Sequence, residues 1–436
     1  MQVSVNTTGP LERQVIVQVP EDQIVGEVKN RLKSISQSAR IDGFRPGKAP
    51  FTLIERRYAA QVRQEVVGEV LNKTFVEAVN QEKLRPAGQP VIDPVNADPG
   101  QGLSYTATFE VYPEVKLAPL AELKIQKPVC EITDADVEKM VETLRKQRRT
   151  WTPVERAAQT GDQITLDFKG TIDGEEFAGG AADDFEIELG AGRFIPDLES
   201  GLVGKAVGDH TIDVNFPDDY HRKELAGKQA RFFLKIKGVA APVLPELNEE
   251  LFKAFGVETG GLEGFRAEVR RNVERERDNA VRNLTKQNVL DALHAANPMQ
   301  LPKSLVAGEA ERLLQETQRN LAMQGAPHDQ LAVMQADSFS PQAERRVALG
   351  LIMSEVIKSN DLKVDGAKVR AAVDGISANY DDPSAVIKWY YEDPKRLGDI
   401  EMSVLEDAAV DRVVEQASVE AVPVAFDALM KPRQTV

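Results

Sequence analysis

The residue types that carry most enzyme chemistry are few and scattered in this sequence of 436 residues. One cysteine, Cys130, and four histidines, His210, His221, His294 and His328, are too dispersed to predict a metal centre, so we expect no metal site. A single cysteine also excludes an internal disulfide, which is typical of a reducing compartment. The Gly-x-x-x-x-Gly-Lys-Ser/Thr pattern of nucleotide-binding loops does not occur, so we expect no nucleotide and no other cofactor.

The octet from 43 to 50 holds the residues that most clearly suggest a binding site. Its two glycines and two prolines forbid a helix and predict an exposed loop. Phe44 would cost free energy in water unless a partner covers it, while Arg45 and Lys48 suit phosphate or carboxylate groups. The candidate binding residues are Gly43, Phe44, Arg45, Pro46, Gly47, Lys48 and Pro50.

This loop lies in a basic segment of an acidic chain, whose net charge is −15. The segment 29–63 contains only two acidic residues, Asp42 and Glu55. Its basic residues are Lys29, Arg31, Lys33, Arg40, Arg45, Lys48, Arg56, Arg57 and Arg63. Charge of this kind fits a solvated helix face as well as a phosphate-binding surface, so composition by itself leaves both interpretations open.

The residues around the loop predict a small α+β domain over 1–112. Alternating apolar residues indicate strands near 3–5, 15–19, 91–95 and 103–111. Helical spacing of apolar residues predicts helices over 21–38 and 51–81. These two helices would hold the two ends of the loop and present its tip to a partner.

The segment from 150 to 246 is rich in glycine and in short β-type runs. The runs lie near 164–168, 185–189, 211–216 and 230–237, and one short helix fits 195–203. Strands at this spacing with a single helix predict a curled antiparallel half-barrel.

Short motifs in this segment follow one another in the order of the FK506-binding-protein type of peptidyl-prolyl isomerase, which the segment resembles. They include Asp167-Phe168-x-Gly170, Asp173-Gly174-x-x-Phe177 and Phe194-Ile195-Pro196-x-Leu198-Glu199-x-Gly201-Leu202. The resemblance implies an apolar pocket for the proline ring, made by Phe168, Phe177, Phe185, Ile195, Leu198, Tyr220 and Phe233. Any one of these residues could equally be plain β-domain core, but the ordered set favours the pocket. Leu198 and Ala178 depart from the family pattern, so binding of the family's drugs does not follow.

From 247 to 432 the sequence is helical almost throughout, with helices expected over 262–296, 302–325, 340–360 and around 402–414. Ser340-Pro341, Asp382-Pro383 and Asp393-Pro394 each place a capping residue before a proline that starts a helix. The segment 113–149 has its own strand and helix and would pair with this helical part. The helices could form an ordinary bundle or long arms with open half-apolar faces, and the residues by themselves favour the bundle.

The octet matches every fixed position of the ribosome-docking loop of trigger factors, the bacterial ribosome-associated chaperones, and the order of the three segments resembles that family over the full chain. The resemblance implies a multidomain α+β protein with a ribosome-binding domain at 1–112, a linker at 113–149, the isomerase domain at 150–246 and a helical chaperone domain with long arms at 247–432. It implies an ATP-independent chaperone whose isomerase activity is secondary. The implied partners are the large ribosomal subunit near the exit tunnel, through ribosomal protein and rRNA, nascent and unfolded polypeptides, and a weak homodimer off the ribosome.

Two other functions fit parts of the sequence. The chain could be a free-standing isomerase whose flanking segments merely dimerise it, or an RNA-binding protein that uses the basic segment. No stretch approaches the ~20 apolar residues of a membrane span, and the first residues lack a secretory signal pattern. We therefore expect a cytosolic protein with no membrane partner.

Overall fold

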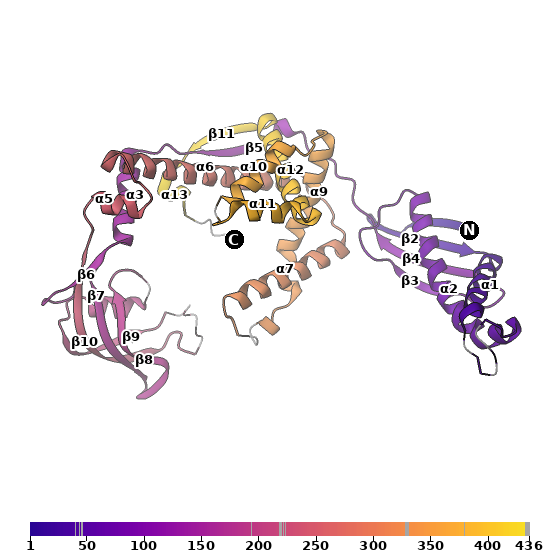
Figure 1. Ribbon diagram of the computed structural model, residues 1–436, viewed down its shortest axis with the longest axis horizontal. Coiled ribbons are helices and arrows are strands. Elements are labelled where there is room, and N and C mark those ends of the chain that lie inside the picture. Colours follow the sequence, from indigo (N-terminus) through magenta and orange to yellow (C-terminus); the bar gives the residue numbers. More distant parts are fainter. Residues whose placement is uncertain are drawn as a thin grey trace. The chain divides into compact units, whose positions relative to one another are not determined.

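The computed structural model describes residues 1–39, 41–42, 44, 47–192, 194–217, 220, 222, 224–327, 331–378 and 380–431, with the backbone alone at 94, 95 and 178. The chain forms two compact units, each made from segments that are distant in sequence. One unit holds residues 1–128 and 283–422, and the other holds 129–282 and 423–436. Both units combine helices with antiparallel strands (Figure 1), so the expected multidomain α+β class is confirmed.

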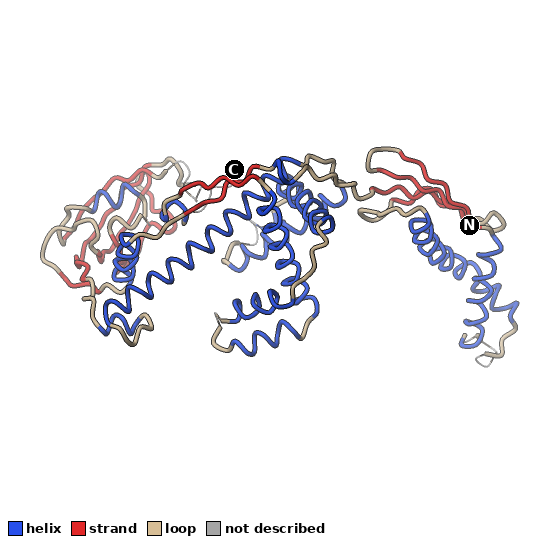
Figure 2. The backbone as a smooth tube through the Cα atoms, turned by 90° about the horizontal axis from the view of Figure 1, so that it is seen from above, coloured by secondary structure: helices blue, strands red, loops and turns tan. Residues whose placement is uncertain are grey.

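The N-terminal part of the first unit is a four-stranded sheet covered by two helices. The strands β1 (Gln2–Thr7), β2 (Glu12–Val19), β3 (Val91–Asn96) and β4 (Leu103–Glu110) lie in the order β1-β2-β4-β3. The helices α1 (Glu21–Ser38) and α2 (Phe51–Gln81) have the expected bounds. Figure 2 shows the red strands of this sheet along one side of the blue helices.

The alternation of apolar and polar residues along β4 determines which face of this sheet is buried. Leu103, Tyr105, Ala107 and Phe109 of β4 are buried, and the residues between them are only partly covered. They pack against the apolar stripes of the helices, which include Ile24, Leu32, Ile54, Val62 and Val66. A sheet face and two helix stripes therefore form a single core, as the apolar periods of 2 and 3.6 residues predict.

The helical part of the first unit is built on the second half of α6 (Gly261–Ala296). The helices α7 (Lys303–Met323), α9 (Ser340–Ser359), α10 (Gly366–Ser377), α11 (Pro383–Tyr391) and α12 (Pro394–Gln416) follow, with the 3₁₀ turn η2 (Ala336–Phe339) before α9. Strand β5 (Lys124–Val129), preceded by the turn η1 (Leu120–Glu122), pairs with β11 (Ser418–Pro423). Leu123 and Ile125 pack into a core with Val289, Ile352 and Val413.

Two of the three expected helix caps are present. The carboxylates of Asp382 and Asp393 accept hydrogen bonds from the backbone N–H groups of Ala385 and Lys395. The expected cap at Ser340 is wrong, because α9 begins at Ser340 itself. The turn η2 already brings the backbone to helical angles there, so the serine lies inside the helix. No helix in the described part of the chain is both long enough and apolar enough to cross a membrane.

The second unit contains a five-stranded antiparallel sheet. The strands are β6 (Thr150–Pro153), β7 (Gln163–Ile172), β8 (Glu175–Glu188), β9 (Gly208–Asn215) and β10 (Gln229–Val243). The order is β6-β10-β7-β8, and β9 pairs with the first half of the long β10. One short helix, α4 (Pro196–Leu202), packs on β9 through Leu198 and Leu202 of the same core. Figure 1 shows the curled sheet, which together with α4 agrees with the expected half-barrel.

The remaining elements of this unit are α3 (Asp134–Gln147), α5 (Glu249–Ala254), the start of α6 and α13 (Phe426–Leu429). A capping box starts α3, with Thr133 and Asp136 exchanging hydrogen bonds. Cys130 is a buried free thiol just before this helix, and burial raises its pKa.

Candidate functional sites

An apolar cavity of about 560 Å³ lies on the inner face of the half-barrel. Six of the seven side chains expected at a proline pocket line it: Phe168, Phe177, Phe185, Ile195, Leu198 and Tyr220. Sequence reasoning missed further lining residues, which include Phe194, Phe216, Leu225, Arg222 and Phe232. The side chain of Ala178 lies outside the described residues.

Several of the rings around the cavity meet edge to face, and these contacts hold its walls together. Phe168 of β7 contacts Phe185 of β8 with ring centroids 5.5 Å apart and planes at 80°. Phe177 contacts Phe232 of β10 at 6.1 Å and 86°. Aromatic pairs in this geometry add about 0.5–1.5 kcal/mol each beyond the area they bury. These contacts pack the rings of the walls against one another.

Phe233 is the one expected pocket residue that lies elsewhere. On β10, Ala230, Phe232, Leu234 and Ile236 are buried, whereas Phe233 points to the opposite face. Phe232 is 4% exposed and Phe233 is 49% exposed. Because successive side chains of a strand point to opposite faces, only one of the two neighbouring rings can line the cavity. The alternation of apolar residues with charged ones along this strand would have identified Phe232.

Two glycines beside these rings leave no room for a side chain. A Cβ atom at Gly170 would lie 2.8 Å from the ring of Phe232, and one at Gly180 would lie 2.9 Å from the ring of Phe177. Such distances are too short for a carbon contact. The glycines let the sheet backbone approach the rings and keep the cavity walls closely packed.

The described lining of the cavity offers little that could act as a nucleophile or bind a metal. Among its described lining residues, Arg222 is the only one with a charged side chain. In the described part of the chain, no group of three or more His, Cys, Asp or Glu side chains is arranged to bind a metal ion. The arrangement can therefore hold an apolar ring in a low-polarity environment.

The second candidate site is the loop between α1 and α2. Phe44 is 44% exposed, and its backbone N–H donates to the carbonyl oxygen of Ile41 at 3.0 Å. Gly47 has φ +78°, and a Cβ there would meet the Gln37 carbonyl oxygen at 3.1 Å. Lys48 and Pro50 are exposed. The predicted residues Gly43, Arg45 and Pro46 lie outside the described residues.

Exposed apolar and basic side chains continue from the loop onto both helices. Phe51 and Leu53 in the first turn of α2 are exposed, as Phe44 is. Lys29, Lys33, Arg56 and Arg57 are exposed on α1 and α2. Arg31 differs, because it pairs with Glu69 on α2 at 3.3 Å.

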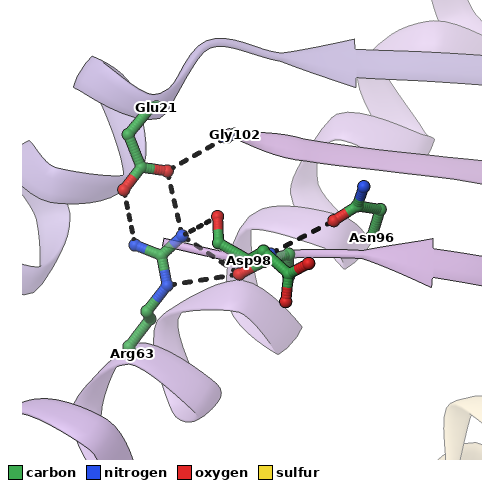
Figure 3. A network of polar contacts seen from close by, with 6 residues as sticks. Glu21, Arg63, Asn96, Asp98 and Gly102 are labelled. Atoms are coloured by element: carbon green, nitrogen blue, oxygen red, sulfur yellow. Dashed lines mark hydrogen bonds and ion pairs between the residues drawn. The ribbon is translucent and has the colours of Figure 1, made fainter. Parts of the chain in front are cut away.

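Arg63 is the clearest exception in the basic segment, because its guanidinium binds inside the domain. Figure 3 shows it facing the carboxylate of Glu21, with two hydrogen bonds of 2.8 and 2.9 Å. Arg63 also donates to the backbone carbonyl oxygens of Ala97 and Asp98, and Glu21 accepts from the N–H of Gly102 at 3.1 Å. Arg63 therefore does not project into solvent, although both interpretations of the basic segment treat it as a surface charge.

This network joins the start of α1, the middle of α2 and the β3–β4 connection. The Arg63 hydrogen bonds lower the pKa of the Glu21 carboxyl to about 2. Glu21 in turn raises the pKa of the Arg63 guanidinium. Charge-assisted pairs with bidentate geometry are among the stronger hydrogen bonds in proteins. The helices α1 and α2 form a helical hairpin with the loop at its tip. We call Glu21, Arg63 and Gly102 the hairpin clamp, because their hydrogen bonds fix how these two helices pack.

Comparison with protein families gives three matches that together span most of the chain. Residues 1–144 match the family described as bacterial trigger factor protein, and residues 261–415 match the C-terminus of the same family. Residues 154–239, which contain the cavity, match the FKBP-type peptidyl-prolyl cis-trans isomerases.

Individual relatives agree over the full length. The chain is 46% identical to the trigger factor of Thioalkalivibrio sulfidiphilus over 435 residues, which covers 100% of this chain and 99% of the relative. It is 45% identical to the trigger factor of Stutzerimonas stutzeri with the same coverage. It is 44% identical to that of Pseudoalteromonas atlantica over 99% of each chain.

Proposed function

The chain belongs to the bacterial trigger factor family, and from this premise we propose that its 43–50 loop is the anchor that holds it on the ribosome. As a family member it is a ribosome-associated chaperone that binds nascent chains and carries an FKBP-type peptidyl-prolyl isomerase domain. The anchor residues would be Gly43, Phe44, Arg45, Pro46, Gly47, Lys48 and Pro50.

The observation that carries the anchor proposal is the exposed ring of Phe44 beside exposed lysines and arginines. Phe44 would fill an apolar hollow of a ribosomal protein near the exit tunnel of the large subunit. Lys48 and the exposed basic residues of α1 and α2 would meet rRNA phosphates or acidic side chains, so affinity should fall as salt rises. A loop held between two clamped helices loses little entropy on docking, which favours binding.

We also propose that the cavity of the half-barrel is the isomerase site. Rotation about an X-Pro bond has a barrier of about 18–20 kcal/mol because the amide is resonance-stabilised. The planar amide is more charge-separated than the twisted one, so a water-poor apolar cavity disfavours the planar form. Hydrogen bonds to the peptide on either side of the proline would then hold the twisted geometry. Phe168, Phe177, Phe185, Ile195, Leu198 and Tyr220 would form the site, with Phe232 in place of Phe233.

The domain limits that we propose are 1–112 for ribosome binding, 113–149 for the linker, 150–246 for the isomerase and 247–432 for binding of unfolded polypeptide. We further propose that the protein acts in the cytosol and forms a weak homodimer off the ribosome. The single cysteine supports a reducing compartment. Exposed Trp389, Tyr391 and Met402 on the helical part support apolar contacts with a partner chain.

The anchor is tested by changing Phe44, Arg45 and Lys48 together to alanine in the full chain. We expect ribosome affinity to fall at least tenfold, or about 1.4 kcal/mol, in a co-sedimentation assay at physiological salt. Folding should be unchanged, because exposed side chains contribute little to the core.

The matched control is the double variant Lys73→Ala and Val76→Ala, which removes an exposed cation and an exposed apolar side chain farther along α2. This control should bind ribosomes like the unchanged protein. Full binding by the triple variant would exclude the anchor. Equal affinity for ribosomes and for naked RNA would instead favour an RNA-binding protein.

A further inference from the structure

Glu199 is a nearly buried carboxylate beside the cavity, and its side chain is not among those that line it. It lies on α4 and is 9% exposed. Its Oε2 accepts a hydrogen bond from the backbone N–H of Gly190 at 3.0 Å, and its Oε1 accepts from the N–H of Phe194 at 3.3 Å. A carboxylate that leaves water is costly unless such donors replace its hydration, so these bonds are structurally important.

The two N–H groups stand at opposite ends of the connection between β8 and α4. Gly190 and Gly192 in this connection have φ of +86° and +67°, in the left-handed region. The carboxylate therefore bridges the start and the end of an irregular backbone segment. Side-chain bridges of this kind replace the hydrogen bonds that regular secondary structure would provide.

The bridged segment forms one wall of the cavity. Gly192, Phe194, Ile195 and Pro196 all line it. The ring of Phe194 contacts Phe185 edge to face at 5.5 Å and 86°, so it joins the connection to the sheet wall. Any movement of the segment between Gly190 and Phe194 would displace this wall.

We propose that Glu199 is a positioning residue for the isomerase, because its carboxylate holds Phe194 and Ile195 in place before a peptide arrives. The proposal rests on the cavity being the isomerase site. Without the bridge, the connection would sample several conformations, and each peptide would have to order it on binding. That ordering cost lowers the apparent affinity for the peptide and for the twisted amide.

The test compares Glu199→Gln with the control Asp162→Asn in the full chain. Glutamine keeps the size, but its NH₂ group faces one of the two N–H donors and cannot accept from it. Asp162 is a suitable control because, like Glu199, it is a buried carboxylate that accepts a hydrogen bond from the backbone. It is 2% exposed, pairs with Arg156, and accepts from the N–H of Gln159 at 2.8 Å. It braces the 156–162 connection, whose residues do not line the cavity.

We expect both variants to lower the unfolding temperature of the domain. Only Glu199→Gln should lower kcat/KM for a short X-Pro peptide about tenfold, with most of the change in KM. It should also speed hydrogen exchange at the Gly190 and Phe194 amides. Activity within twofold of the unchanged protein, or an equal loss in Asp162→Asn, would overturn the positioning role.

A second variant keeps the test decisive if Glu199→Gln does not fold. Glu199→Asp retains the charge but is one methylene shorter, so its carboxylate cannot span both donors. Its kcat/KM should be several-fold lower than that of the unchanged protein, and an unchanged kcat/KM would count against the proposal. Absence of isomerase activity in the unchanged protein would contradict the site assignment itself, which separates the two failures.

Discussion

The apolar cavity and the 43–50 loop are both binding sites in our proposal, yet they are built in opposite ways. The cavity is the inner face of a sheet, so residues such as Phe232 belong to the domain core. The loop presents Phe44 to solvent, and the core of its domain lies elsewhere, under the sheet. At the cavity, binding and stability depend on the same side chains. At the loop they are separable, because the helices and their clamp carry the stability.

The largest effect should come from removing a cavity ring that is also core. Phe232→Ala leaves a void between Phe168 and Phe177, so the isomerase domain should lose about 3–5 kcal/mol of stability. The isomerase activity of this variant should fall together with the stability of the domain. Hydrogen exchange at the β7 and β10 amides measures the loss. Unchanged exchange together with lost activity would show that the cavity is separable from the core after all, and would remove the contrast with the loop.

A smaller effect is expected at the hairpin clamp, where stability depends on pH. The pKa of Glu21 is about 2 in the folded domain, against an ordinary value of 4.5, so the ionised pair stabilises the domain fully above about pH 4.5. This stabilisation is lost as pH falls from there towards 2. Glu21→Gln should cost about 1–3 kcal/mol at neutral pH and almost nothing near pH 2.

Urea unfolding followed at the methyl resonances of Ile24 and Ile54, both in this core, measures that difference at each pH. Asp22→Asn is a suitable control, since Asp22 is exposed on the same turn of α1. A stability difference that does not change with pH would mean that the Glu21 charge is not what the clamp depends on. Ribosome binding by Glu21→Gln would then show whether the clamp also orients the loop.

The smallest effect is predicted for Phe233→Ala, one residue from the most sensitive position. Its ring is half exposed on the outer face, so stability should change by no more than about 0.5 kcal/mol. Isomerase activity on a short peptide should stay within about twofold. A large loss of activity with normal folding would mean that the outer face of the sheet also takes part in the reaction.

Local patterns in the sequence predicted most of the elements. The bounds of α1 and α2 follow from apolar spacing between prolines, and the caps of α11 and α12 follow from the Asp-Pro pairs. The resemblance placed Phe233 in the pocket, whereas the alternation of apolar and charged residues along β10 puts Phe232 on the buried face. Six other cavity residues needed the resemblance, since no local pattern separates a pocket wall from ordinary core.

Long-range pairings were not predictable from one chain. Glu21 and Arg63 are 42 residues apart, and nothing nearby marks either as a partner rather than a surface charge. The bridge from Glu199 to Gly190 depends on how α4 returns to the sheet, which is a property of the tertiary fold. Conversely, Ser340 shows that a strong local capping signal fails when the preceding turn is already helical.

Because Cys130 is buried, the rate at which its thiol reacts with a labelling reagent can report local opening of the structure. Its thiol is the only one in the chain, and it lies between β5 and α3 with a raised pKa. A thiol reagent can reach this buried side chain only when the structure around it opens locally, so the labelling rate at a fixed pH reports the free energy of that local opening. Labelling in the presence of ribosomes or an unfolded polypeptide would therefore show whether binding changes this local opening, without any engineered cysteine.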